Sequence, residues 1–281
     1  MRRFNRFYTR HIGVLTDRYL GQSRPLGEAR LLYEIGSGTT DLRELRGRLD
    51  LDSGYLTRLL RGLGDDRLVE VTPDPADARA RRATLTAAGR REVAEMNRRA
   101  TGVADDLLSG LAEAQRGELV AALGRAERLL RLGAVRVEQA DPAAPAARRC
   151  LTAYANELRD RFPEGFADDD LVDPAQAAVF LVAHESGTPV GCAAVRPLDA
   201  RTGELRHLWV HADARGIGLG RRLLAETERH AADKGLTRLR LGTHEALGEA
   251  VALYRSAGYR ATKPYGDTAH THHWFTKRIS P

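Results

Sequence analysis

The 281-residue chain is poor in cysteine, lysine and aromatic residues, and it contains no long apolar run. Its two cysteines, Cys150 and Cys192, lie far apart without a spacing typical of metal ligands, so we expect core or surface thiols rather than a disulfide. A membrane-spanning helix needs about 18 apolar residues, and no stretch reaches that length. The apolar residues 11–15 are too few for a secretion signal. These absences predict a cytoplasmic protein without a membrane partner.

Arginine supplies almost all of the positive charge, since the chain has only three lysines among its 44 basic residues. The arginines are unevenly placed. Residues 1–133 carry 24 arginines against 19 acidic residues, whereas residues 134–281 carry 20 basic against 19 acidic residues. A basic half beside an almost neutral half predicts that the first half meets a polyanion. The length and the 42% hydrophobic content predict two packed domains.

We place the domain boundary near residue 133, where Leu132-Gly133 is typical of a helix that ends in a glycine cap. The segment before this boundary is expected to be helical except between residues 67 and 86, where the sequence predicts an arginine-rich β-hairpin. Residues 134–281 alternate strands with helices and are expected to form an α/β domain. Before the boundary, the apolar period predicts helices over residues 4–20, 26–35, 41–49, 53–63, 87–108 and 114–132.

Two short predicted helices, 41–49 and 53–63, are followed directly by the hairpin, an order typical of a winged helix-turn-helix. Such a unit places its second helix in the major groove of double-stranded DNA. Asp52 or Ser53 can cap that helix at its start. The first domain, residues 1–133, is therefore predicted to be mainly helical and to bind DNA.

The second of these helices carries side chains that suit contacts with DNA. Tyr55, Arg58 and Arg61 recur at three-residue spacing on one face. Arg58 can reach a guanine edge or a phosphate, while Ser53 and Tyr55 suit phosphate and base contacts near the helix start. The alternative interpretation is that Arg58 and Arg61 form a solvated face without a ligand.

The hairpin tip and the segment after it carry a more specific pattern. Asp77-Ala78-Arg79 precedes Leu85-Thr86-Ala87-Ala88-Gly89, and the two motifs resemble the wing of the MarR family of transcriptional regulators. The resemblance covers residues 3–132 and implies that Arg79 enters the minor groove while Asp77 holds it in place. It also implies a homodimer built by the flanking helices, a DNA operator and, as in many members, a small-molecule effector. The predicted DNA-binding residues are Ser53, Tyr55, Arg58, Arg61, Asp77, Arg79, Arg81 and Arg82.

A glycine-rich turn, Arg215-Gly216-Ile217-Gly218-Leu219-Gly220, lies between an apolar run at 205–210 and a helical pattern that opens at Arg221. Glycine lets the backbone approach a ligand, and the first turn of a helix offers N–H groups and a positive dipole end to an anion. No Lys-Ser/Thr pair follows the turn, which excludes a nucleotide-triphosphatase loop, and Arg221 replaces the third glycine of a dinucleotide fingerprint. The turn predicts a phosphate site, the alternative being a glycine turn without a ligand.

This turn resembles the pyrophosphate-binding signature Arg-x-x-Gly-x-Gly of the GNAT acetyltransferase family. Two further motifs agree with it: Ala250-x-x-Leu253-Tyr254-x-x-x-Gly258-Tyr259 resembles the end of a family helix, and residues 271–277 resemble the closing strand of one branch. Together the matches cover residues 134–278. They imply an α/β fold with a mixed central sheet, acetyl-CoA as the cofactor and direct acetyl transfer to a primary amine.

The resemblance also implies roles for single residues. An amine is mostly protonated near neutral pH and must lose a proton before it attacks a thioester. Glu204 corresponds to the base of some family members, with His207 as the competing base, and Tyr254 corresponds to the residue that protonates the leaving thiolate. The alternatives are an ordinary carboxylate at a strand start and a tyrosine packed in the core. The oxyanion is expected near the N–H groups of Trp209 and Val210, where the strand of the family bulges.

The chain departs from the family pattern ahead of the tyrosine helix. The family often places an asparagine there to contact the pantetheine arm, whereas this chain has Gly242-Thr243-His244-Glu245, so either His244 replaces the amide or the site is weakened. His270, His272 and His273 cluster in the sequence, but strand alternation puts the last two on opposite faces, so we expect a structural or substrate-facing role and no metal site. The predicted cofactor-binding residues are Leu208, Trp209, Val210, Arg215, Gly216, Ile217, Gly218, Leu219, Gly220, Arg221 and His244.

The sequence therefore predicts a fusion of a MarR-like dimeric regulator with an acetyl-CoA-dependent N-acetyltransferase whose acceptor is a small-molecule amine or amino acid. Three alternatives stay open: protein lysine as the acceptor, a second domain that only senses acetyl-CoA or a metabolite, and a first domain that serves only for dimerisation. The missing asparagine favours the sensor, Glu204 and Tyr254 favour the enzyme, and the arginine-rich wing argues against dimerisation alone.

Overall fold

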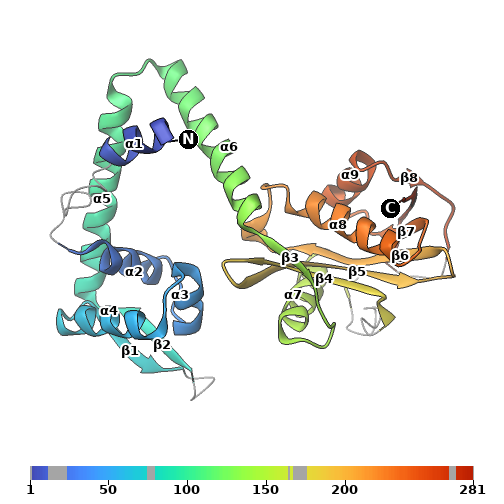
Figure 1. Ribbon diagram of the computed structural model, residues 1–281, viewed down its shortest axis with the longest axis horizontal. Helices are drawn as coiled ribbons and strands as arrows, with labels where there is room; N and C mark the ends of the chain where they lie inside the picture. The colour runs from blue at the N-terminus through green and yellow to red at the C-terminus, as the bar shows by residue number, and fades with distance from the viewer. Residues whose placement is uncertain are drawn as a thin grey trace. The chain divides into compact units, whose positions relative to one another are not determined.

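The structure, a computed structural model, describes residues 2–11, 24–74, 80–163, 165–166, 176–265 and 270–280. The chain divides into two compact units, Met1–Gly124 and Arg125–Pro281 (Figure 1). The division lies inside α6 (Glu113–Ala134), whereas the sequence placed it near residue 133. The end of α6 joins the second unit because Arg131 donates two hydrogen bonds to Glu185, at 2.8 and 2.9 Å, and Leu132 packs against that unit's core.

The first unit consists of helices and one two-stranded antiparallel sheet in the part of the chain that is described. One apolar cluster joins its elements between residues 31 and 93, and Leu32, Leu45 and Leu63 are fully buried in it. The helix predicted over residues 4–20 is described only as far as His11, and the rest of it lies outside the described residues. The elements are α1 (Arg2–His11), α2 (Leu26–Gly36), α3 (Leu42–Leu49), α4 (Ser53–Asp65), β1 (Val69–Pro73), β2 (Arg81–Leu85) and α5 (Ala87–Ser109), followed by α6.

Short-range contacts explain where the helices of this unit begin. Asp52 rather than Ser53 caps α4, because the Asp52 carboxylate accepts the N–H of Tyr55 at 2.8 Å. The Thr86 hydroxyl caps α5 by accepting the N–H of Gly89 at 3.0 Å, and the N–H of Thr86 donates to the carbonyl of Leu68 at 3.0 Å. A Cβ at Gly89 would lie 2.1 Å from that carbonyl oxygen, so only glycine fits. Thr86 and Gly89 thus fix α5 to the base of the hairpin.

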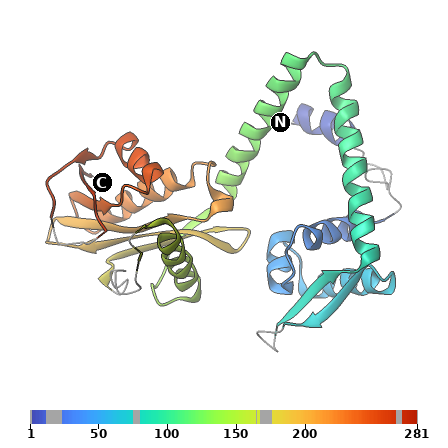
Figure 2. The same ribbon diagram turned by 180° about the vertical axis from the view of Figure 1, so that it is seen from behind.

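The second unit is an α/β domain with a seven-stranded sheet in the order β3-β4-β5-β6-β7-β9-β8. All neighbouring strands are antiparallel except β6 and β7, which confirms the predicted mixed sheet. Helices α8 and α9 cover one face and α7 lies against the other (Figures 1 and 2). In the described ranges, no helix has the length and apolarity needed to cross a membrane. The elements are β3 (Arg136–Gln139), α7 (Pro145–Arg161), β4 (Val179–Glu185), β5 (Thr188–Pro197), β6 (Thr202–Val210), η4 (Ala212–Ala214), α8 (Leu219–Asp233), β7 (Arg238–Thr243), α9 (Gly248–Ser256), β8 (Arg260–Ala261) and β9 (His273–Arg278).

Candidate active site

The sheet opens where β6 leaves β7. The two strands pair only from Thr202 to Glu204, whereas β6 continues to Val210 and β7 pairs with β9 along its whole length. At the far end of β6, the N–H of His211 donates to the carbonyl of Val190, just after β5 begins, at 2.9 Å. Since successive N–H groups of an extended chain point to opposite sides, the N–H of Val210 points into the opening. One wall of the opening therefore presents backbone hydrogen-bond donors.

Strand β6 carries a β-bulge beside this opening. His207 and Leu208 together oppose the single residue Ala193 of β5, and His207 has a φ of 55°. The bulge therefore lies immediately before the Trp209-Val210 pair at which we predicted it. The difference arises because pairing with β5, which a single strand sequence does not reveal, decides where the extra residue falls.

The two cysteines lie behind the bulge. Cys150 of α7 and Cys192 of β5 are buried free thiols, in agreement with the prediction. The Cys192 thiol donates to the carbonyl of His207 at 3.3 Å. A hydrogen bond with Cys150, together with burial, raises the pKa of Cys192, so this thiol stays protonated near neutral pH and keeps its bond to the bulge.

The glycine-rich turn joins β6 to α8. Gly216 and Gly218 have φ values of 75° and 95°, which other residues rarely adopt, so the turn itself requires both glycines. The first hydrogen bond within α8 runs from the N–H of Arg222 to the carbonyl of Gly218. The N–H groups of residues 219–221 therefore come before the first hydrogen bond of the helix. The side chains of Ile217 and Leu219 are buried, which leaves only their backbone for a ligand. The turn has the geometry of an anion site at a helix start.

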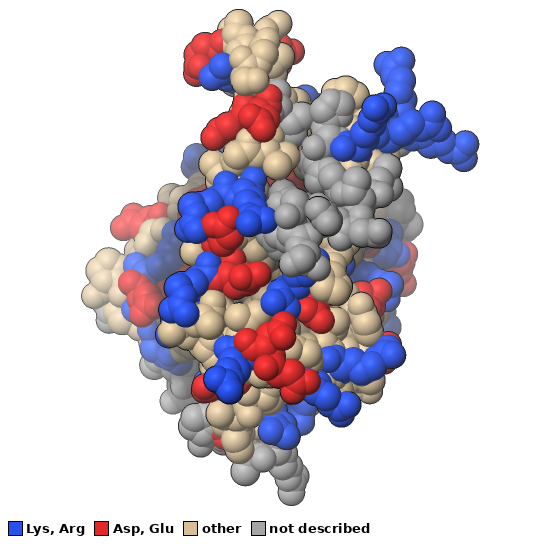
Figure 3. All heavy atoms as spheres, turned by 90° about the vertical axis from the view of Figure 1, so that its left-hand side faces the viewer, with Lys and Arg blue, Asp and Glu red and all other residues tan. Residues whose placement is uncertain are grey.

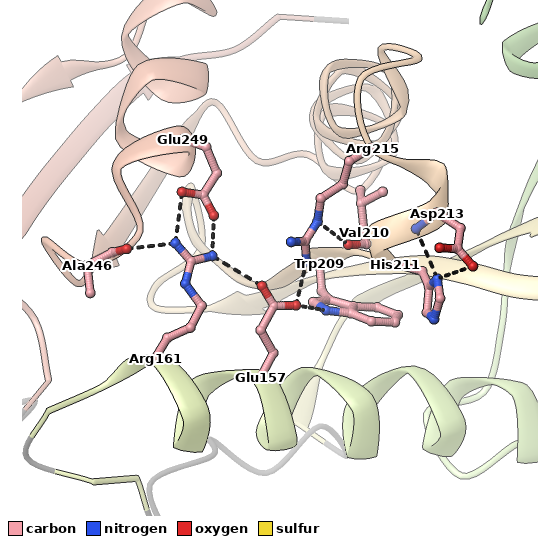
Figure 4. Close-up of polar contacts among 9 residues, drawn as sticks. All are labelled: Glu157, Arg161, Trp209, Val210, His211, Asp213, Arg215, Ala246 and Glu249. Atoms are coloured by element: carbon pink, nitrogen blue, oxygen red, sulfur yellow. Dashed lines mark hydrogen bonds and ion pairs between the residues drawn. The ribbon is translucent and has the colours of Figure 1, made fainter.

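A carboxylate on α7 fixes both the end of β6 and this turn (Figure 4). Oε2 of Glu157 accepts hydrogen bonds from the indole N–H of Trp209 at 2.8 Å and from Arg215 at 2.5 Å. Arg215 also donates to the carbonyl of Val210 at 2.9 Å. Burial alone would raise the pKa of Glu157, but the hydrogen bonds that it accepts, from Trp209 first, hold the pKa below its ordinary value. The polar groups of Trp209 and Arg215, two predicted cofactor ligands, are thus engaged inside the protein.

The same network continues to the start of α9. Arg161, one turn after Glu157, donates to it at 3.1 Å and to the carbonyl of Ala246 at 2.7 Å. Arg161 also forms a two-bond ion pair with Glu249, which is the main cause of the raised pKa of Arg161 and of the lowered pKa of Glu249. Sequence reasoning missed Glu157 and Arg161. Their four-residue spacing was the one signal, and many solvated helix faces share it.

Tyr254 lies on α9, which packs beside the glycine turn. A Cβ added to Gly220 would lie 3.5 Å from α9, and the Arg221 side chain donates to Ser256 at 2.9 Å. Tyr254 is buried, and burial raises its pKa, so the phenol keeps its proton near neutral pH. Tyr154 of α7 adds to this shift.

Glu204 belongs to a buried ion cluster and is not a solvated carboxylate. Its side chain is 5% exposed, and its Oε2 accepts a hydrogen bond from Arg196 at 2.5 Å and lies 3.1 Å from Nε of Arg206. Oε1 takes part in neither contact. His207, the competing base, is also buried and meets the ring of Tyr154 edge-on at 6.0 Å. Both candidate bases thus lie on β6 where it leaves β7.

His244 packs in an aromatic cluster before α9. Its ring is buried and stacks on the ring of Phe162, with 4.0 Å between the ring centroids. Its Nδ1 accepts the N–H of Ala246 at 2.9 Å. The ring centroid of His272 lies 4.3 Å from that of His244, and the ring centroid of His270 lies 5.6 Å from that of Phe162. Among the described residues, no group of three or more His, Cys, Asp or Glu is arranged to hold a metal ion.

The first unit presents a second candidate site on α4. The guanidinium of Arg58 lies 5.4 Å over the ring of Tyr55. Basic and acidic side chains are interspersed over the face drawn in Figure 3, so charge of one sign does not dominate that face. The helix exposes all four residues that we predicted to contact DNA, Ser53, Tyr55, Arg58 and Arg61.

The predicted wing residues differ in their surroundings. Arg81 is exposed on β2. Arg82 donates to the Thr40 hydroxyl at 3.0 Å and lies 3.4 Å from the Asp74 carboxylate, so its guanidinium is already engaged within the first unit. Asp77 and Arg79 lie outside the described residues.

Comparison with known proteins finds relatives of the second unit. A model of the acetyltransferase (GNAT) family matches residues 147–259. An IAA acetyltransferase of Azospirillum brasilense is 41% identical over 88 residues, which cover 31% of this chain and 58% of the relative. An uncharacterized N-acetyltransferase of Schizosaccharomyces pombe is 35% identical over 105 residues, which cover 35% of this chain and 64% of the relative. The chain thus spans less than two thirds of the length of both relatives.

Among solved structures, a GNAT-family acetyltransferase of Staphylococcus aureus Mu50 is 16% identical, with 52% of this chain and 100% of that chain covered and a TM-score of 0.47. The region that the family model matches runs from the first turn of α7 to the end of α9. It contains the opening, the bulge, the glycine-rich turn and the Glu157 network. Residues 147–259 of this chain are thus similar to the acetyltransferase (GNAT) family.

Proposed function

We propose that the second unit is an acetyl-CoA-dependent N-acetyltransferase that transfers the acetyl group directly to a primary amine. The opening between β6 and β7 supports this most, because it has the glycine turn and the start of α8 at one end and backbone donors along its wall. In this proposal, N–H groups of residues 216–221 hold the pyrophosphate, and the edge of β6 near Val210 binds the pantetheine arm. The thioester then lies beside the bulge.

The transfer forms a bond between the amine nitrogen and the acetyl carbon and breaks the bond between that carbon and sulfur. Oε1 of Glu204 takes the proton of the ammonium through water, with His207 as the competing base. Backbone N–H groups at the bulge stabilise the oxyanion. Tyr254 gives its proton to the leaving thiolate, since burial keeps the phenol protonated until then.

A thiol-release assay with acetyl-CoA and a panel of amines, amino acids and lysine peptides tests this activity. Release of coenzyme A above the amine-free rate supports the enzyme and identifies the acceptor. Tight acetyl-CoA binding without release from any amine favours the second candidate, a regulator that senses acetyl-CoA. The observation that favours the sensor is the buried ring of His244, in the segment where the family often has an asparagine that contacts the pantetheine arm.

Gly218→Val is expected to abolish the thermal stabilisation that acetyl-CoA gives to the protein. Valine at a φ of 95° disrupts the start of α8, so the N–H groups no longer converge on the pyrophosphate. The measurement is Tm with and without acetyl-CoA, since a ligand at about 100 times its Kd adds about 2.7 kcal/mol. Gly235→Val is the matched control, with a φ of 86° just after α8 ends. An unchanged shift in Gly218→Val removes the turn from the cofactor site.

We also infer that the first unit is a winged helix-turn-helix that binds operator DNA as a transcriptional regulator. The order of α3, α4 and the β1–β2 hairpin supports it, as does the exposed face of α4. In this proposal Arg58 reads a base edge in the major groove, and Arg79 enters the minor groove. A small-molecule effector is the remaining expected partner of this unit.

Arg58→Ala is expected to weaken binding to a selected operator about 10- to 100-fold and to leave binding to unrelated DNA almost unchanged. The measurement is fluorescence anisotropy with operator and scrambled duplexes over a salt titration. Arg91→Ala, which removes an exposed arginine of α5, is the control for lost charge. Equal binding of wild type and Arg58→Ala to the operator at every salt concentration contradicts the winged-helix proposal.

We propose that a second copy of the chain covers the apolar side chains exposed on α1 and α6. Phe4 and Phe7 are 51% and 58% exposed, and Val120 and Leu123 are 60% and 44% exposed. Exposed apolar groups of this size are typical of an interface, and a dimer matches the two-fold symmetry of operators. Val120→Asp combined with Leu123→Asp is expected to convert a dimer to a monomer in sedimentation velocity. A dimer that persists in this variant places the interface elsewhere.

A further inference from the structure

Three arginines and one glutamate lie side by side at the closed end of the opening. Strand register places Arg196 of β5, Glu204 of β6 and Arg240 of β7 in one row, and Arg206 is two residues further along β6. Ala194, two residues before Arg196, belongs to the core beneath α7, so the row lies on the α7 face of the sheet. The side chains of Arg196 and Arg206 are 30% and 20% exposed, and Arg240 is half-buried. Three partly buried cations thus surround one carboxylate.

Glu204 does not neutralise this cluster. Its Oε2 meets Arg196 and Arg206, whereas the guanidinium of Arg240 lies 4.8 Å over the ring of Tyr265. The Nε of Arg240 is shielded from solvent and makes no hydrogen bond to any residue that the structure describes. A shielded N–H donor without an acceptor is unfavourable, and a bound anion recovers that free energy. The cluster therefore has the charge and the unpaired donor of an anion site.

This anion site is separate from the glycine-rich turn. A strand rises about 3.3 Å per residue, so the segment from Glu204 to Val210 spans about 20 Å. The bulge at His207 and Leu208 lies between the two ends. An anion at Arg240 is therefore on the opposite side of the bulge from the turn that would hold the phosphates. That side is where an acceptor can approach a thioester at the bulge.

We propose that Arg206, Arg240 and Tyr265 bind a carboxylate of the acetyl acceptor, so that the substrate is an amino acid or another amine that carries a carboxylate. The inference rests on the proposed N-acetyltransferase activity. Guanidinium groups on neighbouring strands can bind both oxygens of one carboxylate, and the Tyr265 hydroxyl supplies a further donor. Glu204 holds Arg206 in position through Oε2. An amine without the carboxylate leaves Arg240 unpaired, which makes the site selective.

The test compares amines that differ in one group only: L-amino acids, their carboxamides and their phosphonic acid analogues, in the coenzyme A release assay. The wild type is expected to prefer the amino acid over its carboxamide at least about 10-fold in kcat/KM. Arg240→Gln is expected to raise KM for the amino acid about 10- to 100-fold and to leave KM for the carboxamide unchanged. Arg260→Gln, which removes an exposed arginine of β8, is the matched control and is expected to change neither.

A second readout, Tm in the presence of coenzyme A and an N-acetyl amino acid, needs no turnover. Arg240→Gln is expected to abolish the increase in Tm that the N-acetyl amino acid gives, without lowering the Tm of the unliganded protein. Equal use of amino acids and carboxamides overturns the carboxylate site but leaves the N-acetyltransferase intact, and a preference for phosphonic acids overturns the choice of carboxylate. If no amine releases coenzyme A, the proposed activity fails, and the Arg240-dependent shift in Tm decides the anion site by itself.

Discussion

Tyr254→Phe is expected to lower kcat for acetyl transfer about 100- to 1000-fold, while acetyl-CoA still stabilises the protein against heat. Only the hydroxyl is lost, so the ring keeps its packing against Tyr259 and Phe275, whose ring centroids lie 5.8 and 6.1 Å away. Because burial raises the pKa of Tyr254, the wild-type phenol carries a proton at every physiological pH and can give it to the leaving thiolate. The measurement is coenzyme A release at saturating acetyl-CoA and amine.

Tyr259→Phe is the matched control for this substitution. Tyr259 is buried beside Tyr254, and burial raises its pKa as well. Its ring centroid, however, lies 5.5 Å from the Lys277 ammonium, and its hydroxyl faces Glu228. The control is expected to keep the wild-type turnover. Full activity in Tyr254→Phe would instead assign the proton to another group. Tyr154, whose pKa burial raises to about 12, is then the next candidate.

Features that depend on a few consecutive residues could be predicted from the sequence. The turn around Gly216 and Gly218 needs two positive φ angles, which glycine adopts without strain, and the spacing of the glycines shows where they fall. The cap of α4 by Asp52 likewise needs only the carboxylate and the N–H three residues later. The acetyltransferase (GNAT) family model then matched the region that contains the glycine turn.

Features that depend on strand pairing or on distant helices could not be predicted in the same way. The bulge falls at His207 because of the register between β5 and β6, and Arg240 lies beside Glu204 because of the parallel register between β6 and β7. Glu157 comes from a helix far from either motif, and its helical spacing is shared by ordinary surface carboxylates. The residues that organise the candidate site therefore became visible only in three dimensions.

Glu157→Ala is expected to lower the free energy of unfolding of the second unit by about 2–3 kcal/mol and Tm by about 5–10 °C. The Glu157 side chain is only 23% exposed, and its loss leaves the Trp209 indole N–H without its acceptor. Arg215 also loses the anion that holds it beside the turn, so affinity for acetyl-CoA is expected to fall as well. Calorimetry measures both effects. Asp160→Ala, an exposed site on the same helix, is the control.

The pH dependence of this stabilisation separates the charge of Glu157 from its size. Its pKa is lowered in the folded protein, so its contribution is fully present above the ordinary carboxyl pKa of about 4.3 and is lost as pH falls through the lower folded value. Glu157→Gln keeps an acceptor for Trp209 but removes the anion. The difference in Tm between wild type and Glu157→Gln is therefore expected to be constant between about pH 6 and 8 and to shrink below about pH 4. Equal Tm values near pH 7 would mean that a neutral hydrogen bond is enough to hold the turn.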